Sequence, residues 1–138
     1  MRRGRIDLKI IDKILEDRVH ISFEVFPPKT DDGYDKVISA VDEIARLAPS
    51  FISVTYGAGG GTSKNTANIA AHIQNELGVD SIAHLTCVSS TKSEVQNMIS
   101  TLKEKGIQNL LALRGDIPKD SAFPTPGHYQ YASELIED

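Results

Sequence analysis

Residues 51–61 read FISVTYGAGGG, a β-branched and aromatic run that passes directly into a glycine-rich run. The first six residues alternate in polarity, which predicts a strand. Residues 64–77 then place apolar side chains at helical spacing, and Gly78 follows as a helix stop. The stretch therefore predicts one strand–loop–helix unit.

The same unit recurs on both sides of this stretch. The other expected strands cover residues 19–26, 81–87 and 109–114. Two of the other expected helices cover residues 34–47 and 129–137. A further helix begins at a capping box formed by Thr91 and Glu94 and ends at Gly106. A short helix over residues 8–15 lies in the segment 1–18, ahead of the βα units of 19–138. We expect one α/β domain over 1–138 with a parallel sheet.

Side-chain parity separates two architectures that share this order, an open doubly wound sheet and a (β/α)₈ barrel. One expected face is apolar: Phe23, Val25, Ile52, Val54, Ala83, Leu85, Leu111 and Leu113. The other is polar: Ser22, Glu24, Ser53, Thr55, His84, Thr86, Arg114 and Asp116. Helices cover both faces of an open parallel sheet, so both should be apolar. A polar face near the strand ends favours the TIM-barrel type.

The chain has 138 residues, whereas a complete barrel needs about 250. We therefore expect the first four βα units, a half-barrel with two unpaired edge strands. Two copies can associate, a partner or missing segment can complete the structure, or the sheet can stay open. The sequence leaves these three alternatives open.

Composition restricts the class of protein. The net charge of −4 argues against nucleic-acid binding through bulk charge. No run approaches the roughly 18 apolar residues of a membrane span, and no signal-peptide core follows the basic N-terminus. Cys87 is the one cysteine, and no Cys/His spacing indicates a metal site. These features favour a cytoplasmic protein.

Several residues could carry chemistry. Glu24 sits among apolar side chains at a strand end, where a carboxyl group loses hydration and suits a general acid; the alternative is a solvated or salt-bridged strand residue. The glycine run matches neither the dinucleotide fingerprint nor the phosphate loop, so it is either an anion-holding turn or a plain connection. Cys87 has the opposite parity to His84 and should pack beneath a helix.

The end of the fourth expected strand reads Arg114, Gly115, Asp116. Gly115 would let a ligand approach the backbone while its charged neighbours bind it. The alternative is an ordinary Arg–Asp pair. His84 is either a satisfied strand histidine or a ligand-binding group, and the remaining histidines show no metal-binding spacing.

Five motifs in one order make the chain resemble the methylenetetrahydrofolate reductase family. They are SFEVFPP (22–28), SVTYGAGG (53–60), HLTC (84–87), LRGD (113–116) and YASEL (131–135). The resemblance implies the N-terminal half of a (β/α)₈ barrel that binds FAD at the carboxyl ends of its strands. It also implies a flavoprotein of one-carbon metabolism and methionine biosynthesis. NAD(P)H would reduce the flavin, and the flavin would reduce 5,10-methylenetetrahydrofolate to 5-methyltetrahydrofolate.

The resemblance also implies residue roles. Glu24 corresponds to the acid that helps open the five-membered ring of the folate, and Asp116 to a carboxylate beside flavin and pterin. The positions that correspond to FAD-binding residues are Thr55, His84, Arg114, Gly115, Asp116, Tyr131 and Ala132. Because roughly the second half of the family barrel is absent, this chain could be a truncated form. The alternatives are a non-catalytic flavin- or anion-binding half-barrel that acts by association and a structural fragment without ligand.

Overall fold

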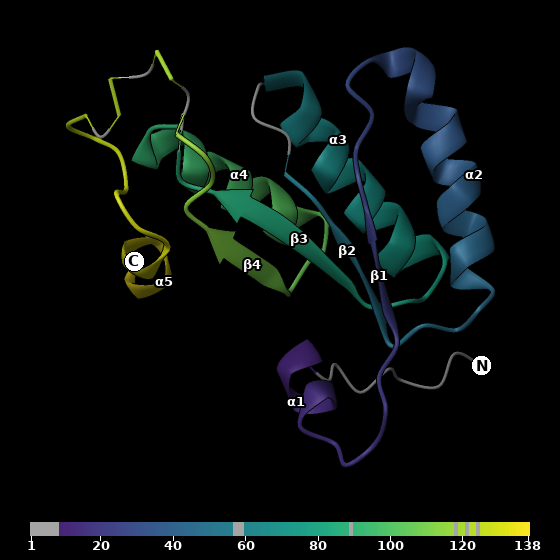
Figure 1. The fold of residues 1–138 in the computed structure, drawn as a ribbon. Helices are drawn as coiled ribbons and strands as arrows, with labels where there is room; N and C mark the ends of the chain where they lie inside the picture. The colour runs from purple at the N-terminus through teal and green to yellow at the C-terminus, as the bar shows by residue number, and fades with distance from the viewer. Residues whose placement is uncertain (1–8, 57–59, 89, 118, 121, 124) are drawn as a thin grey trace.

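A computed structural model describes residues 9–56, 60–88, 90–117, 119–120, 122–123 and 125–138. Its centre is one parallel sheet with the strand order β1-β2-β3-β4 (Figure 1). The strands are β1 (Ser22–Val25), β2 (Phe51–Val54), β3 (Ser81–Thr86) and β4 (Leu110–Leu113). Each predicted strand is confirmed, in a shorter form.

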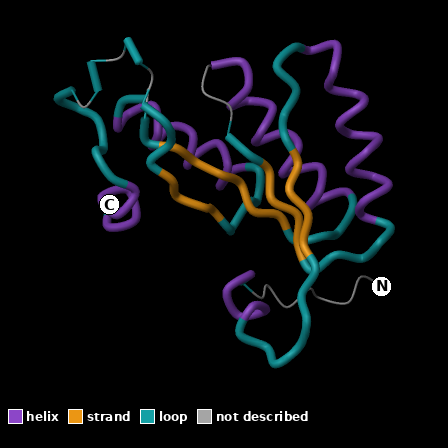
Figure 2. The backbone as a smooth tube through the Cα atoms, in the orientation of Figure 1, coloured by secondary structure: helices purple, strands orange, loops and turns teal. Residues whose placement is uncertain are grey.

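Helices alternate with these strands, as Figure 2 shows. They are α1 (Ile10–Ile14), α2 (Tyr34–Ala45), α3 (Gly60–Ala71), α4 (Lys92–Glu104) and α5 (Ala132–Glu137). A 3₁₀ turn, η1 (Asp31–Gly33), precedes α2, and a π-helical turn, η2 (His72–Glu76), extends α3. This is the α/β order of half a TIM barrel, which confirms the predicted fold class.

Two helix starts and the burial of the first helix differ from the prediction. The third helix begins at Gly60, so the last two glycines of the run are helical. The first helix buries Ile10, whereas Ile11 and Ile14 are exposed, so its expected apolar face is mostly uncovered. The last helix begins at Ala132, three residues later than expected.

The helices α2 and α3 pack against one face of the sheet, and this layer holds the main core. The face contributes Val25, Ile52, Val54 and Ala83. The covering elements contribute Val41, Ile69, Ile73 and Leu102. These side chains are at most 8% exposed, and such burial of apolar surface is the main favourable term in folding.

A second cluster joins β3 to α4 and α5. It contains Leu85, Cys87, Val95, Tyr129 and Leu135. The Cys87 thiol is buried, donates to the Leu113 carbonyl at 3.2 Å and has a pKa raised mainly by burial. The prediction that Cys87 packs beneath a helix is confirmed, and a raised pKa makes this thiol a poor nucleophile.

The opposite face of the sheet carries no helix in the described part of the chain (Figure 1). The β3–β4 register pairs His84 with Leu111 and Thr86 with Leu113. Paired residues of parallel strands point to the same side, so Leu111 and Leu113 lie on the polar face. The predicted parity of the fourth strand is therefore wrong by one residue.

The first helix ties the amino-terminal ends of the strands together. The Ile10 backbone N–H donates to Asn109 Oδ1 at 3.1 Å. The ammonium of Lys13 forms an ion pair with Asp80 and donates to the Ser50 carbonyl at 3.4 Å. Of the helices that are described, none is long and apolar enough to cross a membrane.

The π-helical turn η2 connects α3 to the rest of the helical layer. Its defining bond runs from the Leu77 N–H to the His72 carbonyl at 3.1 Å, five residues back. His72 Nε2 also lies 2.7 Å from Asp42 Oδ1 on α2. Asn75 donates from Nδ2 to the Lys105 carbonyl at 2.9 Å, so η2 is fixed to both neighbouring helices.

The predicted capping box at the start of α4 is confirmed. The Glu94 N–H donates to Thr91 Oγ1 at 3.2 Å, and the Thr91 N–H donates to Glu94 Oε2 at 2.7 Å. The Thr91 N–H and the Thr91 hydroxyl both donate to Glu94 Oε2, and these two hydrogen bonds lower the pKa of Glu94.

We expect Thr91→Ala to lower the free energy of unfolding by about 1 kcal/mol, because one free N–H of the first turn loses its acceptor. Urea denaturation measures the change. The matched control is Ser93→Ala in the same turn, since Ser93 is exposed. Equal effects of the two substitutions would contradict the cap.

Candidate functional site

Three polar side chains converge on the uncovered face of the sheet. Glu24 on β1 and Ser53 on β2 are register partners, and Ser53 Oγ donates to Glu24 Oε2 at 3.4 Å. His84 on β3 places Nε2 at 3.5 Å from the same Oε2 oxygen. Side chains from β2 and β3 thus approach the same carboxylate oxygen of a residue on β1.

This cluster has an uneven exposure to solvent. His84 is 8% exposed and Ser53 is 9% exposed, whereas the Glu24 side chain is 48% exposed. The expected loss of hydration at Glu24 is therefore wrong for the chain alone. Burial lowers the pKa of His84, and the Glu24 charge opposes this effect without overcoming it. The imidazole is consequently neutral near pH 7.

Thr55 and Thr86 lie at the carboxyl ends of β2 and β3. The Thr55 N–H donates to the Val25 carbonyl at 3.0 Å, which continues the β1–β2 ladder beyond the last strand residue. Its carbonyl accepts from Thr66 Oγ1 at 2.9 Å. The Thr55 backbone is therefore held from β1 and from α3.

The expected ligand-binding triplet follows β4. Backbone bonds from Cys87 and Val88 to the carbonyls of Leu113 and Arg114, 3.0 and 2.9 Å long, extend the β3–β4 ladder to this point. Arg114 is exposed and donates from Nε to the Gly115 carbonyl at 3.3 Å. Among the residues that the structure describes, no ion pair joins Arg114 to Asp116, so the alternative of an ordinary Arg–Asp pair is not observed.

Gly115 has a backbone conformation that favours glycine, with φ of +84°. A Cβ atom there would lie 2.5 Å from Val88 Cγ1 and 3.1 Å from Thr86 Cβ. Both the torsion and the close approach of β3 therefore require glycine.

The YASEL motif begins at the amino-terminal end of α5. Tyr131 is the N-cap residue and is 58% exposed, and Ala132 is the first helical residue. The Gln130 N–H donates to Glu134 Oε2 at 2.7 Å, which fixes this end. Residues 57–59 of the glycine run lie outside the described residues, and its last two residues belong to α3.

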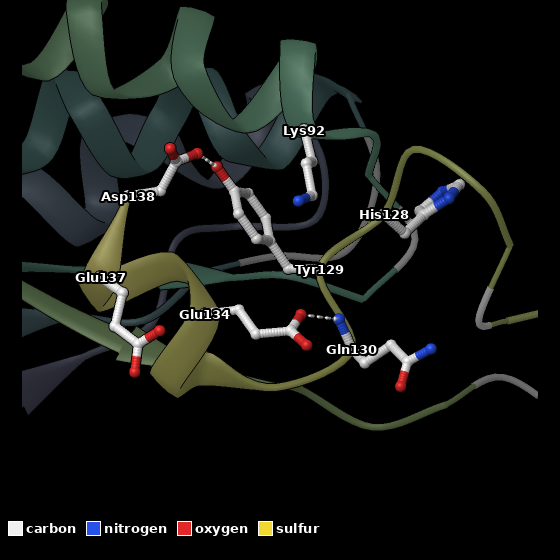
Figure 3. Close-up of a pocket in the computed structure, with 7 residues that line it drawn as sticks. All are labelled: Lys92, His128, Tyr129, Gln130, Glu134, Glu137 and Asp138. Carbon is white, nitrogen blue, oxygen red and sulfur yellow. Dashed lines mark hydrogen bonds between the residues drawn. The ribbon is translucent and has the colours of Figure 1, made fainter.

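A separate open cavity of about 550 Å³ lies between α4 and α5 (Figure 3). It is lined by Lys92, His128, Tyr129, Gln130, Glu134, Glu137 and Asp138. The Tyr129 hydroxyl donates to Asp138 and accepts from Gln96 Nε2, the latter at 3.0 Å. The ammonium of Lys92 lies 4.7 Å from the centre of the Tyr129 ring. Glu134 of the YASEL motif lines this cavity, but none of the predicted site residues does.

The remaining histidines have local partners. His72 faces Asp42, His20 Nδ1 lies 3.1 Å from Ser50 Oγ, and His128 contacts Thr125 through Nδ1. Within the described ranges, no group of three or more His, Cys, Asp or Glu side chains could hold a metal ion.

The residue that sequence reasoning did not assign to the site is Ser53. Its parity matches that of Glu24 on the neighbouring strand, and this was the available signal.

A family model described as methylenetetrahydrofolate reductase matches residues 9–138. The chain belongs to the methylenetetrahydrofolate reductase family. This confirms the resemblance that the five motifs predicted.

Curated relatives are similar over most of the chain. A methylenetetrahydrofolate reductase (NADH) 1 of Zea mays is 39% identical over 136 residues, covering 94% of this chain and 23% of the relative. A 5,10-methylenetetrahydrofolate reductase of Buchnera aphidicola is 40% identical over 130 residues (92% and 43%), and one of Escherichia coli is 34% identical over 122 residues (88% and 40%). The chain thus spans less than half of these reductases.

We expect Gly115→Ala to destabilise the chain more than Gly127→Ala. Both glycines have positive φ, +84° and +88°, but a Cβ at Gly127 would meet nothing within 4 Å. The torsion alone costs about 1–2 kcal/mol, and the contacts with β3 add about 1–3 kcal/mol at Gly115. Denaturant unfolding of both variants measures the difference. Equal losses would show that Gly115 is required for its torsion alone.

Proposed function

We propose that this chain provides the N-terminal half of a flavin-dependent enzyme that reduces 5,10-methylenetetrahydrofolate to 5-methyltetrahydrofolate with NAD(P)H. The observation that supports it most is the convergence of Glu24, Ser53 and His84 on the uncovered sheet face. Family membership supplies the substrate class. We also propose that residues 1–138 form a single domain, the N-terminal half of this barrel. The α/β order of the described part supports this proposal.

Glu24 is the proposed general acid. It would donate its proton to the ring nitrogen of the folate that leaves the bridging carbon, so that the C–N bond breaks and a reactive iminium forms. A half-exposed carboxyl group on the open face can reach such a substrate, and substrate binding would remove the remaining water.

The residues present fit FAD, the proposed cofactor. Arg114 is exposed, and its guanidinium suits phosphate oxygens. Tyr131 offers an exposed aromatic ring for contact with a flat ring system. Gly115, the next proposed FAD-binding residue, lies directly beside the exposed Arg114 and Asp116. Thr55, His84 and Ala132 complete the proposed FAD-binding set, with Asp116 as a charge beside it. FAD supplies hydride transfer when bound.

In this proposal, residues of the chain itself hold and orient the Glu24 carboxylate. His84 and Ser53 keep the Glu24 carboxylate on the open face, and Asp116 adds a negative charge at the β4 end.

The names of the plant relatives specify NADH. We propose a nicotinamide dinucleotide as the electron donor and the cytoplasm as the compartment, in agreement with the free thiol of Cys87.

Two apolar surfaces beside the edge strands support association, with a second copy or with a completing segment. A groove of about 160 Å³ along β4 is lined by Leu85, Ile99, Leu110, Ala112, Leu135 and Ile136. A hollow of about 330 Å³ beside β1 is lined by Arg18, Val19, Ile21, Phe23, Leu47, Ala48, Pro49 and Ser50. Neighbouring strands and helices of a closed barrel would cover both surfaces.

We expect the purified chain to sediment as an oligomer, because the groove along β4 leaves Leu110 40% exposed. The substitution Leu110→Glu should shift the distribution toward monomer. The control is Leu15→Glu, which changes an exposed leucine of the α1 end outside both apolar surfaces. Sedimentation of the unmodified chain as a clean monomer that unfolds cooperatively would contradict self-association.

A non-catalytic flavin- or anion-binding half-barrel is the alternative function, for which the supporting observation is the exposed Arg114, whose guanidinium suits an anion. An absorbance spectrum of the purified protein, followed by oxidation of its reduced flavin with folate substrate, separates the candidates. Bound flavin with folate-dependent oxidation supports the reductase. Bound flavin without it supports the binding module, and absence of flavin supports a structural fragment.

We expect Glu24→Gln to retain flavin and to lose folate reduction in the assembled enzyme, because the amide cannot donate the required proton. The reduction of flavin by NAD(P)H serves as the internal control, since it does not use this acid. Loss of about 10²-fold or more in folate-dependent oxidation is the expected result. Unchanged folate turnover would refute the acid role.

A further inference from the structure

We propose that Ser53 is a positioning residue that fixes the Glu24 carboxylate through Oε2, so that Oε1 carries and delivers the proton. This inference deepens the proposed function and rests on it for the chemistry of Glu24. The geometry on which it depends can be tested in the chain alone.

The backbone places Ser53 directly beside Glu24. The two residues are register partners in adjacent parallel strands, and both side chains lie on the uncovered face. Ser53 is 9% exposed, so its hydroxyl has little access to bulk water. A buried hydroxyl requires a hydrogen-bond partner, and Glu24 Oε2 provides one at 3.4 Å.

His84 approaches the same oxygen across the intervening strand β2. Its Nε2 atom lies 3.5 Å from Glu24 Oε2. Because burial lowers the pKa of His84, the ring is neutral near pH 7 and can present an N–H to the carboxylate in the appropriate tautomer. Ser53 and His84 therefore both address Oε2, from two different strands.

This arrangement distinguishes the two oxygens of the carboxyl group. Oε2 faces two donors, and within the described part of the chain Oε1 accepts no hydrogen bond. A protonated carboxyl group has one O–H and one acceptor oxygen. Donors at Oε2 favour the form in which Oε2 accepts and Oε1 holds the proton. The acid proton would thus lie on the oxygen that is free to meet a substrate.

The Ser53 contact is longer than the usual O–H···O distance of about 2.5–3.0 Å. Hydrogen bonds of catalytic groups are often long before a ligand binds, and they shorten in the complex. We expect this shortening here, because a bound substrate would restrict the half-exposed Glu24 side chain to the side of Ser53 and His84.

The first test measures the pKa of His84 by NMR titration of the histidine side chains in the chain itself. Glu24→Gln removes the charge that raises this pKa, so the value should fall. Ser53→Ala should lower it in the same direction and by less, because the released carboxylate can swing toward solvent. Ser53→Thr, which keeps the hydroxyl, should restore the value of the unmodified chain.

Two control substitutions test whether the shifts in the pKa of His84 are specific to the Ser53–Glu24 contact. Ser22→Ala makes the same chemical change on the exposed neighbouring position of β1 and should leave the pKa of His84 unchanged. Asp42→Asn should affect His72, its partner at 2.7 Å, and leave His84 unaffected. Should Ser53→Ala not fold, Ser53→Cys replaces it, since it keeps a similar shape with a weak donor.

The second test separates half-reactions in the flavin-loaded enzyme. Ser53→Ala should slow oxidation of the reduced flavin by folate about tenfold, a loss in the range expected for a misplaced catalytic group, and should not change flavin reduction by NAD(P)H. The positioning role would be overturned if the pKa of His84 were the same in the unmodified chain and in the Ser53→Ala or Ser53→Cys variant. If the NMR shifts appear but no variant or parent reduces folate, the positioning stands and the proposed function fails.

Discussion

The packing of helices on a single face of the sheet is the constraint on which the rest of the structure depends. Alternation along each strand sends Val25, Val54 and Ala83 toward the helices and their neighbours to the opposite side. Burial of the first set holds the strands in register. That register then fixes which polar side chains meet on the uncovered face.

The candidate site follows from this register more than from any loop. Glu24, Ser53 and His84 come from three consecutive strands, so their relative positions are set by backbone hydrogen bonds and by the core behind them. A site on strands is held more rigidly than a site on connecting segments. The groups proposed for the cofactor, in contrast, lie where β4 ends and α5 begins, and they include the exposed Arg114 and Tyr131.

The sequence was informative wherever polarity alternates. The parity of β1, β2 and β3 could be predicted, which placed Glu24, Ser53 and His84 on one face in advance. The fourth strand, Leu110–Leu113, is apolar at every position, so it carries no alternation from which to choose a face. A shift of one residue exchanges the two faces, and this exchange is the error made at Leu111 and Leu113.

Other features needed three-dimensional information for a different reason. Glycine disfavours helix, so a helix that begins at Gly60 goes against local propensity and depends on packing of the residues that follow. The exposure of Glu24 depends on what covers the open face, which local sequence does not specify. The cavity beside Tyr129 brings together residues from α4 and the last helix, which are far apart along the chain.

The π-helical turn at His72–Glu76 has a consequence for how the length of this family can vary. Such a turn corresponds to an α-helix with one additional residue inserted, and the flanking segments keep their orientation. Loss of one residue from this turn would convert it to ordinary α-helix while leaving the entry into β3 in phase. Single-residue insertions and deletions among homologous sequences are therefore expected to concentrate at this turn, and to be rare within the strands, where each would invert the faces of the sheet.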